Sequence, residues 1–103
     1  MSEIKKIEEG DLVSYINLRI SKRPDVLIEE IDEETVLFDP QNRNTYALNQ
    51  VGSIIWQLCD GEHTPREISE EISDVLGVDS AQVLKDVLKI INELLDKKLV
   101  ETN

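Results

Sequence analysis

The chain has 103 residues, which suffices for one domain with a single core but is short for a catalytic domain with a deep cleft. Its 22 acidic and 11 basic residues give a formal net charge of −11, which opposes binding to the phosphate backbone of nucleic acids. The single cysteine, Cys59, excludes an internal disulfide and predicts a buried structural thiol in a reducing compartment.

The first 23 residues are predicted to be a partly flexible extension before a domain at residues 24–103. Residues 1–11 are polar, and residues 1–10 lack the apolar core of a signal peptide. No apolar run approaches the roughly 18 residues of a membrane span, so we expect a cytoplasmic protein without a membrane partner. Residues 12–20 form an apolar patch that suits an extra strand, a short helix or a docking segment. Pro24 then interrupts the chain.

Three strands are predicted in the next part of the chain. Residues 26–31 and 35–39 are rich in β-branched and apolar residues, and the acidic turn at residues 32–34 joins them into a hairpin. The turn residues Asp39-Pro40-Gln41-Asn42 then lead into a third strand at residues 44–48. Short connections of this kind predict an antiparallel meander with one face toward the core.

Three helices are predicted after the strands. Asn49 caps the first, which we expect to end at Gly61. Thr64, Pro65 and Glu67 form the signature of a capping box and begin a second helix that ends at Gly77. The last helix covers residues 80–98, with a second predicted capping box from Asp79 to Gln82 and apolar residues at three- and four-residue spacing. Leu99 and Val100 could fold back as a short strand.

The predicted fold class is therefore α+β, with a three-stranded antiparallel sheet followed by three helices, the last two of which have helix-turn-helix spacing. An outer strand of such a sheet has unpaired N–H and C=O groups that can pair with an added strand. We expect a peptide to lie along residues 44–48 while the last helix forms the other wall of the groove. The added backbone hydrogen bonds and apolar side chains would together provide the affinity.

Two alternative functions have some support in the sequence. A helix-turn-helix could bind DNA, but the first turns of the last helix contain Asp79 and Asp86 instead of clustered arginines. The stretch Leu76-Gly77-Val78-Asp79-Ser80 is similar to the phosphopantetheine attachment signal of acyl and peptidyl carriers, although the residue after Ser80 is the small Ala81. The sequence has no metal-ligand cluster, phosphate loop or paired catalytic histidines, so neither an enzyme nor a bound metal or cofactor is predicted.

A family resemblance is visible between residues 24 and 101. The stretch Tyr46-Ala47-Leu48-Asn49, the pair Ile55-Trp56, and Asp60-Gly61 before Thr64-Pro65-Arg66-Glu67-Ile68 together resemble the PQQ-synthesis protein D (PqqD) family, also called the RiPP recognition element. Leu37-Phe38-Asp39 upstream and Lys85-Asp86-Val87 with Leu99-Val100 downstream extend the likeness.

The resemblance implies a function and a site. It implies a small winged helix-turn-helix domain that binds the leader segment of a ribosomally made precursor peptide. The domain would present that segment to a modifying enzyme, expected to be a radical SAM enzyme, in PQQ or other RiPP biosynthesis. The family's cleft between the third strand and the third helix, carried onto this chain together with the strand edge, gives the expected peptide-binding residues Asn44, Thr45, Tyr46, Ala47, Leu48, Val83, Leu84, Val87, Leu88 and Ile91.

Overall fold

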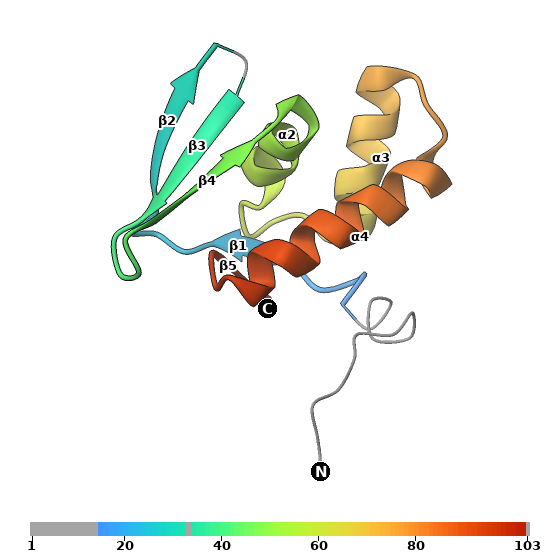
Figure 1. Cartoon of the computed structure of the whole chain (residues 1–103). Helices are drawn as coiled ribbons and strands as arrows, with labels where there is room; N and C mark the ends of the chain where they lie inside the picture. The colour runs from blue at the N-terminus through green and yellow to red at the C-terminus, as the bar shows by residue number, and fades with distance from the viewer. Residues whose placement is uncertain (1–14, 33, 103) are drawn as a thin grey trace.

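The computed structural model describes residues 15–32 and 34–102. Within these residues the chain forms three helices, a three-stranded sheet and a two-stranded sheet (Figure 1). In chain order the elements are β1 (Ile20–Lys22), β2 (Leu27–Ile31), β3 (Glu34–Asp39), β4 (Asn44–Leu48), α2 (Gln50–Leu58), α3 (Pro65–Leu76), α4 (Ser80–Asp96) and β5 (Val100–Thr102). This arrangement confirms the predicted α+β class, whereas the similarity to a winged helix-turn-helix stays a prediction. The predicted flexibility of residues 1–11 lies outside the described residues.

The larger sheet is an antiparallel meander in the order β2-β3-β4. Its second turn is fixed by Asp39, whose Oδ1 accepts a hydrogen bond from the backbone N–H of Gln41 at 3.0 Å, as in an Asx turn. Leu37 pairs with Ile28 on one side and with Tyr46 on the other. Along β3 the burial alternates, because Thr35, Leu37 and Asp39 are buried while the residues between them are not. One face of the sheet therefore lies on the core.

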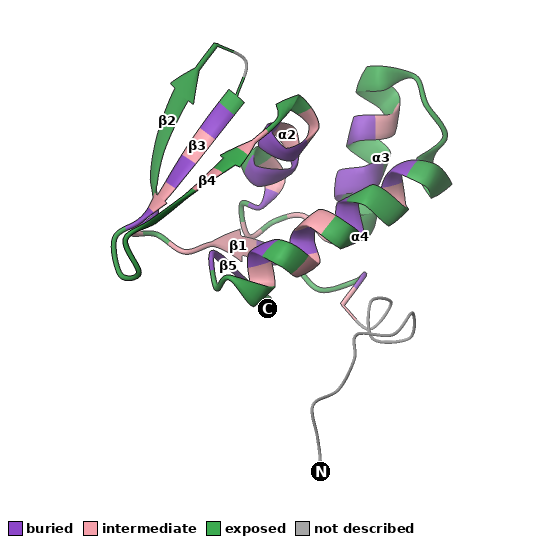
Figure 2. Cartoon of the chain, in the orientation of Figure 1, coloured by how far each residue is buried: buried purple, intermediate pink, exposed green. Residues whose placement is uncertain are grey.

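The strand β2 is exposed along its whole length, as the green ribbon in Figure 2 shows. Leu27 is 60% exposed and Ile31 is 51% exposed. A shallow hollow on this part of the sheet is lined by Leu27, Val36, Phe38 and neighbouring residues. The helices therefore cover only one face of the sheet.

The smaller sheet joins the two ends of the described chain. β1 pairs antiparallel with β5, and Ile20 is opposite Thr102. The short strand expected at Leu99 and Val100 is present as β5, although it begins at Val100, and the apolar patch at residues 12–20 contributes a strand from Ile20 onward. Ile20 is fully buried. The division of the chain at residue 23 stays a prediction, but the sheet includes residues on both sides of it.

The helix α2 follows β4 directly because Asn49 forms the corner. The Asn49 side chain accepts a hydrogen bond from the backbone N–H of Gly52 at 2.9 Å, which confirms the predicted cap. A Cβ atom at Gly52 would lie 3.3 Å from the Cβ of Leu48, so glycine permits this close approach. The helix ends at Leu58 and not at Gly61, although Gly61 has the predicted positive φ of 82°. Cys59 breaks the helix by adopting non-helical backbone angles.

The helices α3 and α4 pack against each other and cross at a steep angle (Figure 1), and both contribute buried apolar residues to the core. Thr64 and Glu67 make both hydrogen bonds of the capping box, and Gly77 ends α3 in the left-handed conformation, as predicted. The predicted second capping box is wrong, because the Asp79 side chain makes no capping hydrogen bond. The core includes Ile68 and Ile72 of α3, Ile55 and Trp56 of α2, and Leu37 of the sheet.

The two caps provide a direct test of this difference. Thr64→Ala removes a cap that is present and is expected to lower the free energy of unfolding by about 1 kcal/mol. Asp79→Ala removes no capping bond and is expected to change it by much less. Urea unfolding of both variants at unchanged m-value measures the effect. Equal losses in the two variants would contradict the cap assignment.

Candidate peptide-binding groove

One edge of β4 is unpaired in the described part of the chain. β4 lies at the end of the strand order and pairs only with β3 among those residues. In an antiparallel strand, the N–H and C=O groups that do not bond to the neighbour point to the other edge. Residues 44–48 therefore offer backbone donors and acceptors for a further strand.

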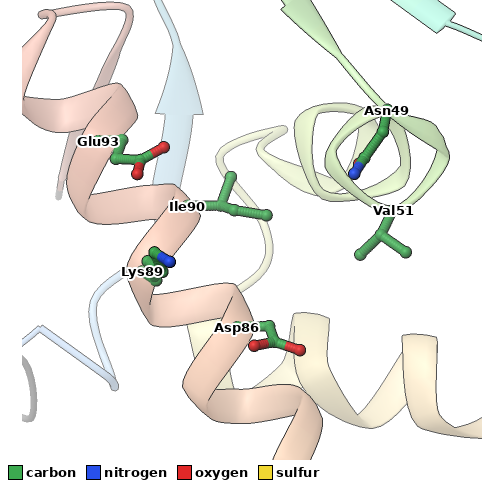
Figure 3. Close-up of a pocket in the computed structure, with 6 residues that line it drawn as sticks. All are labelled: Asn49, Val51, Asp86, Lys89, Ile90 and Glu93. Atoms are coloured by element: carbon green, nitrogen blue, oxygen red, sulfur yellow. The ribbon is translucent and has the colours of Figure 1, made fainter.

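A hollow lies between the start of α2 and α4, next to the end of β4. It has a volume of about 380 Å³. Figure 3 shows the six residues that line it, which are Asn49, Val51, Asp86, Lys89, Ile90 and Glu93. Val51 and Ile90 are half-buried and pack against the core, so they give the hollow an apolar base. The other four are exposed and polar.

A contact between Tyr46 and Lys97 shows how β4 and α4 run relative to one another. The Lys97 Nζ atom lies 5.4 Å from the centre of the Tyr46 ring, a cation–π distance. Tyr46 thus faces the end of α4, while Asn49 and Val51 face residues 86–93. The step from Tyr46 to Asn49 covers about 10 Å of strand, and the step from Lys97 to Ile90 covers about 10.5 Å of helix. The two elements therefore border one groove in antiparallel directions.

The predicted residues on the strand side all lie in β4. Asn44, Thr45 and Ala47 are exposed. Tyr46 and Leu48 are half-buried and pack against the core. The predicted bounds of this strand agree with the structure, and its edge borders the groove. The role of these five residues in peptide binding stays a prediction.

The predicted residues on the helix side lie behind the groove or away from it. Val83, Val87, Leu88 and Ile91 are buried. Leu84 and Leu88 are each two residues before a residue that lines the hollow, which places them about 200° around the helix from the groove. A ligand in the hollow would instead meet Ile90, which packs on the core that contains Val87 and Ile91. The contribution of these five residues to a peptide site stays a prediction.

Sequence reasoning alone missed most of the open helix face. Ile90 widens the apolar stripe of α4 beyond a single seam, and this is the signal in the sequence that could have located the groove. Lys89 and Glu93 gave no such signal, because charged residues on an exposed helix face are common. Only the packing of α2 against α4 shows which flank of the stripe stays open.

Two other candidate reactive residues, Cys59 and Ser80, do not line this hollow. Cys59 is fully buried, and burial raises the pKa of its thiol to about 12, so it is held as the unreactive thiol. Ser80 is exposed at the first position of α4. In residues 15–32 and 34–102, no group of three or more His, Cys, Asp or Glu residues is placed to hold a metal ion. None of the described helices is both long enough and apolar enough to cross a membrane.

His63 joins the turn after α2 to helix α3. Its Nδ1 lies 2.9 Å from Asp60 Oδ1, and its Nε2 lies 2.9 Å from Glu71 Oε2. The hydrogen bond with Asp60, followed by that with Glu71, raises the pKa of His63 above 6.5. The two carboxylates therefore stabilise the charged form of the His63 imidazole.

This arrangement predicts a pH-dependent stability. A raised pKa in the folded state stabilises the protein below the unfolded-state value, and the stabilisation is lost as the pH rises through the folded-state pKa. The thermal midpoint of the unchanged protein should therefore exceed that of His63→Gln, and the difference between the two midpoints should be largest below pH 6.5. The difference should shrink at higher pH in thermal unfolding followed by circular dichroism. A difference that is constant across this range would contradict the assignment.

Comparison with known proteins shows the family to which the chain belongs. The family model described as Coenzyme PQQ synthesis protein D (PqqD) matches residues 34–100, which is more than half of the chain. The chain belongs to the PqqD family. No match was found among curated proteins. The match to the family model confirms the predicted resemblance.

Solved structures show the same fold as this PqqD-like chain. The structure described as TbiB1 in complex with the TbiA(beta) leader peptide is 32% identical, with a TM-score of 0.71 over 79% of this chain and 94% of that chain. The PqqD part of Methylobacterium extorquens PqqCD, described as a stand-alone RiPP recognition element, is 22% identical, with a TM-score of 0.68 over 84% and 92%. A lasso peptide synthetase B1 complexed with its leader peptide is 18% identical, with a TM-score of 0.71 over 81% and 98%. The last two support the fold alone.

Proposed function

We propose that this PqqD-like chain binds the leader segment of a ribosomally made precursor peptide as an additional strand along β4. The observation that carries the proposal is the unpaired edge of β4 beside a hollow with an apolar base. The similarity to TbiB1, whose structure contains the TbiA(beta) leader peptide, supports binding of a leader peptide. The strand would lie between β4 and α4, next to Asn49.

The energetics require both the strand edge and the hollow. Each backbone hydrogen bond contributes about 0.5–1.5 kcal/mol net. Ordering each peptide residue costs about 1–2 kcal/mol, so the added ladder alone roughly balances its own entropy cost. Burying one aliphatic side chain adds about 1.5–3 kcal/mol. Side chains that enter the hollow at Val51 and Ile90 would therefore decide the affinity.

The protein would act as a binding partner and leave the chemistry to a modifying enzyme. The lone cysteine is buried and its thiol is protonated at neutral pH, so it offers no nucleophile. Peptide modification then requires a second protein, and we propose a radical SAM enzyme for this role. The strand added to β4 would extend the sheet and carry the peptide's downstream residues toward that enzyme.

NMR titration tests the proposed site. The probe is a synthetic peptide that covers the first half of a short precursor encoded beside the gene, and a scrambled peptide of equal composition is the control. We expect chemical-shift changes in residues 44–49 and 86–93, together with slower amide exchange at alternate residues of β4. Changes confined to β2 or to the exposed face of α3 would overturn the assignment to this groove.

A further inference from the structure

The charges around the hollow are arranged along one face of α4. Ile90 points from α4 toward α2, and the carboxylates of Asp86 and Glu93 lie on either side of it along the helix (Figure 3). Among the described residues, neither carboxylate has an ion-pair partner within 4.0 Å. Lys97 contacts the Tyr46 ring at the far end of the groove. An aliphatic base is thus flanked by two exposed negative charges, and Lys89 lies between them on the same helix, so the charge on this wall of the hollow is mixed but net negative.

The spacing of these three residues matches that of alternate residues in a strand. Asp86 lies four residues before Ile90 and Glu93 three residues after it, which corresponds to about 6 Å and 4.5 Å along the helix axis. In an extended peptide, residues i−2, i and i+2 share one face and are about 6.5 Å apart. A peptide side chain that contacts Ile90 therefore has its neighbours on the same face close to Asp86 and Glu93.

We infer that the groove selects a leader segment in which an aliphatic residue is flanked, two positions away on one or both sides, by Lys or Arg. This inference rests on the proposed function and adds the class of peptide that the site reads. Ile90 and Val51 supply the contact for the aliphatic side chain, while Asp86 and Glu93 act as specificity-determining residues. A peptide with Asp or Glu at the flanking positions is disfavoured by like-charge repulsion.

The size of the expected effect is modest and measurable. Charge pairs that are exposed to solvent each alter an equilibrium by a small amount, so two such pairs are expected to change the affinity by about three- to tenfold. Because the interaction is exposed, the preference should also weaken at high salt. The aliphatic contact would set whether a peptide binds, and the two carboxylates would set which register and which sequence bind best.

Selection from a displayed library of random twelve-residue peptides tests the inference without a known precursor. For the unchanged protein, we expect enriched peptides to have Lys or Arg two positions from an aliphatic residue. The double variant D86N/E93Q should lose this preference, and D86K/E93K should select Asp or Glu at the same positions. The matched control E70K/D74K changes the net charge equally on the exposed face of α3, where both residues line a separate hollow, and should keep the original preference.

The outcomes separate the inference from the proposed function. Enriched peptides without a charge preference, or an unchanged preference in D86K/E93K, would overturn the specificity assignment while leaving peptide binding intact. A preference that reverses equally in E70K/D74K would attribute the effect to the overall charge and would also overturn it. Absence of any enriched peptide would overturn the proposed function itself. Fluorescence anisotropy of one enriched peptide and its Glu-substituted form should show at least a threefold difference in Kd.

Discussion

Replacing Ile90 with Asp is expected to weaken leader-peptide binding by about 10-fold or more while the protein remains folded. Ile90 is half-buried and lines the hollow between α2 and α4. Loss of one buried aliphatic contact corresponds to about 1.5–3 kcal/mol, which is roughly a 10- to 150-fold change in Kd. The new carboxylate would also be desolvated by a bound peptide. Titration calorimetry at a temperature well below the thermal midpoint measures the change.

Leu95→Asp is the matched control for this variant. Leu95 lies on the same helix, is also half-buried and also packs against the core, but it does not line the hollow. Both variants should therefore lose a similar amount of stability, whereas only Ile90→Asp should lose peptide affinity. If the two variants weaken binding equally, the loss comes from general destabilisation and the groove assignment fails.

Replacing Arg23 with Met is expected to lower the thermal midpoint by about 10 °C or more, because it leaves a buried carboxylate without its partner. The Arg23 guanidinium forms an ion pair with Asp39, which is fully buried, and donates a hydrogen bond to the backbone carbonyl of Lys98 at 2.9 Å. Its Nε lies 2.6 Å from Asp25. Arg23 thus connects the start of β2, the turn after β3 and the segment before β5.

The pH dependence of this variant distinguishes loss of charge pairing from loss of packing. The hydrogen bond from Arg23 lowers the pKa of Asp39 from 3.8 to about 2. A lowered pKa stabilises the folded state above the unfolded-state value, and this stabilisation is lost as the pH falls from about 4 to 2. The difference in thermal midpoint between the unchanged protein and Arg23→Met should therefore be largest above pH 4 and narrow toward pH 2.

A second substitution provides the control for Arg23. The double variant R23M/D39N removes the uncompensated charge and should recover part of the stability lost in Arg23→Met. Thermal unfolding followed by circular dichroism measures all three proteins. Two results would contradict the role of charge pairing. One is a difference in thermal midpoint between the unchanged protein and Arg23→Met that does not depend on pH, and the other is a double variant that is less stable than Arg23→Met. Either result would show that Arg23 stabilises the protein through the packing of its aliphatic part and not through its charge.

Local signals made much of this fold predictable. The bounds of β4 agree with the sequence prediction because a strong turn at residues 39–43 precedes it and the cap Asn49 follows it. The capping box at Thr64 and the left-handed Gly77 define α3 for the same reason. Each of these signals depends on residues within a few positions of one another. The residues from Asp79 to Gln82 have the composition of a capping box, but the prediction from them was wrong because the Asp79 side chain makes no capping hydrogen bond.

Features that depend on distant residues could not be predicted in this way. The pairing of β1 with β5 and the ion pair of Arg23 with Asp39 join segments that have no local sequence relation. The candidate site shows the same division. Its strand side follows from local pattern, but its helix side depends on which flank of the α4 apolar stripe α2 and α3 cover. Val87 and Ile90 are both apolar, and only packing assigns the first to the core and the second to the groove.

The pairing of β1 with β5 also affects how this domain can be joined to other proteins. Ile20 is opposite Thr102, so the polypeptide enters the first strand at the place where it leaves the last one. A tether attached after residue 102 would therefore leave the molecule beside the start of β1, whereas residues 15–17 before that strand run to α3 and α4. An enzyme fused after residue 102 would therefore start from a position that this pairing and the contact of β5 with α4 hold constant relative to the peptide groove.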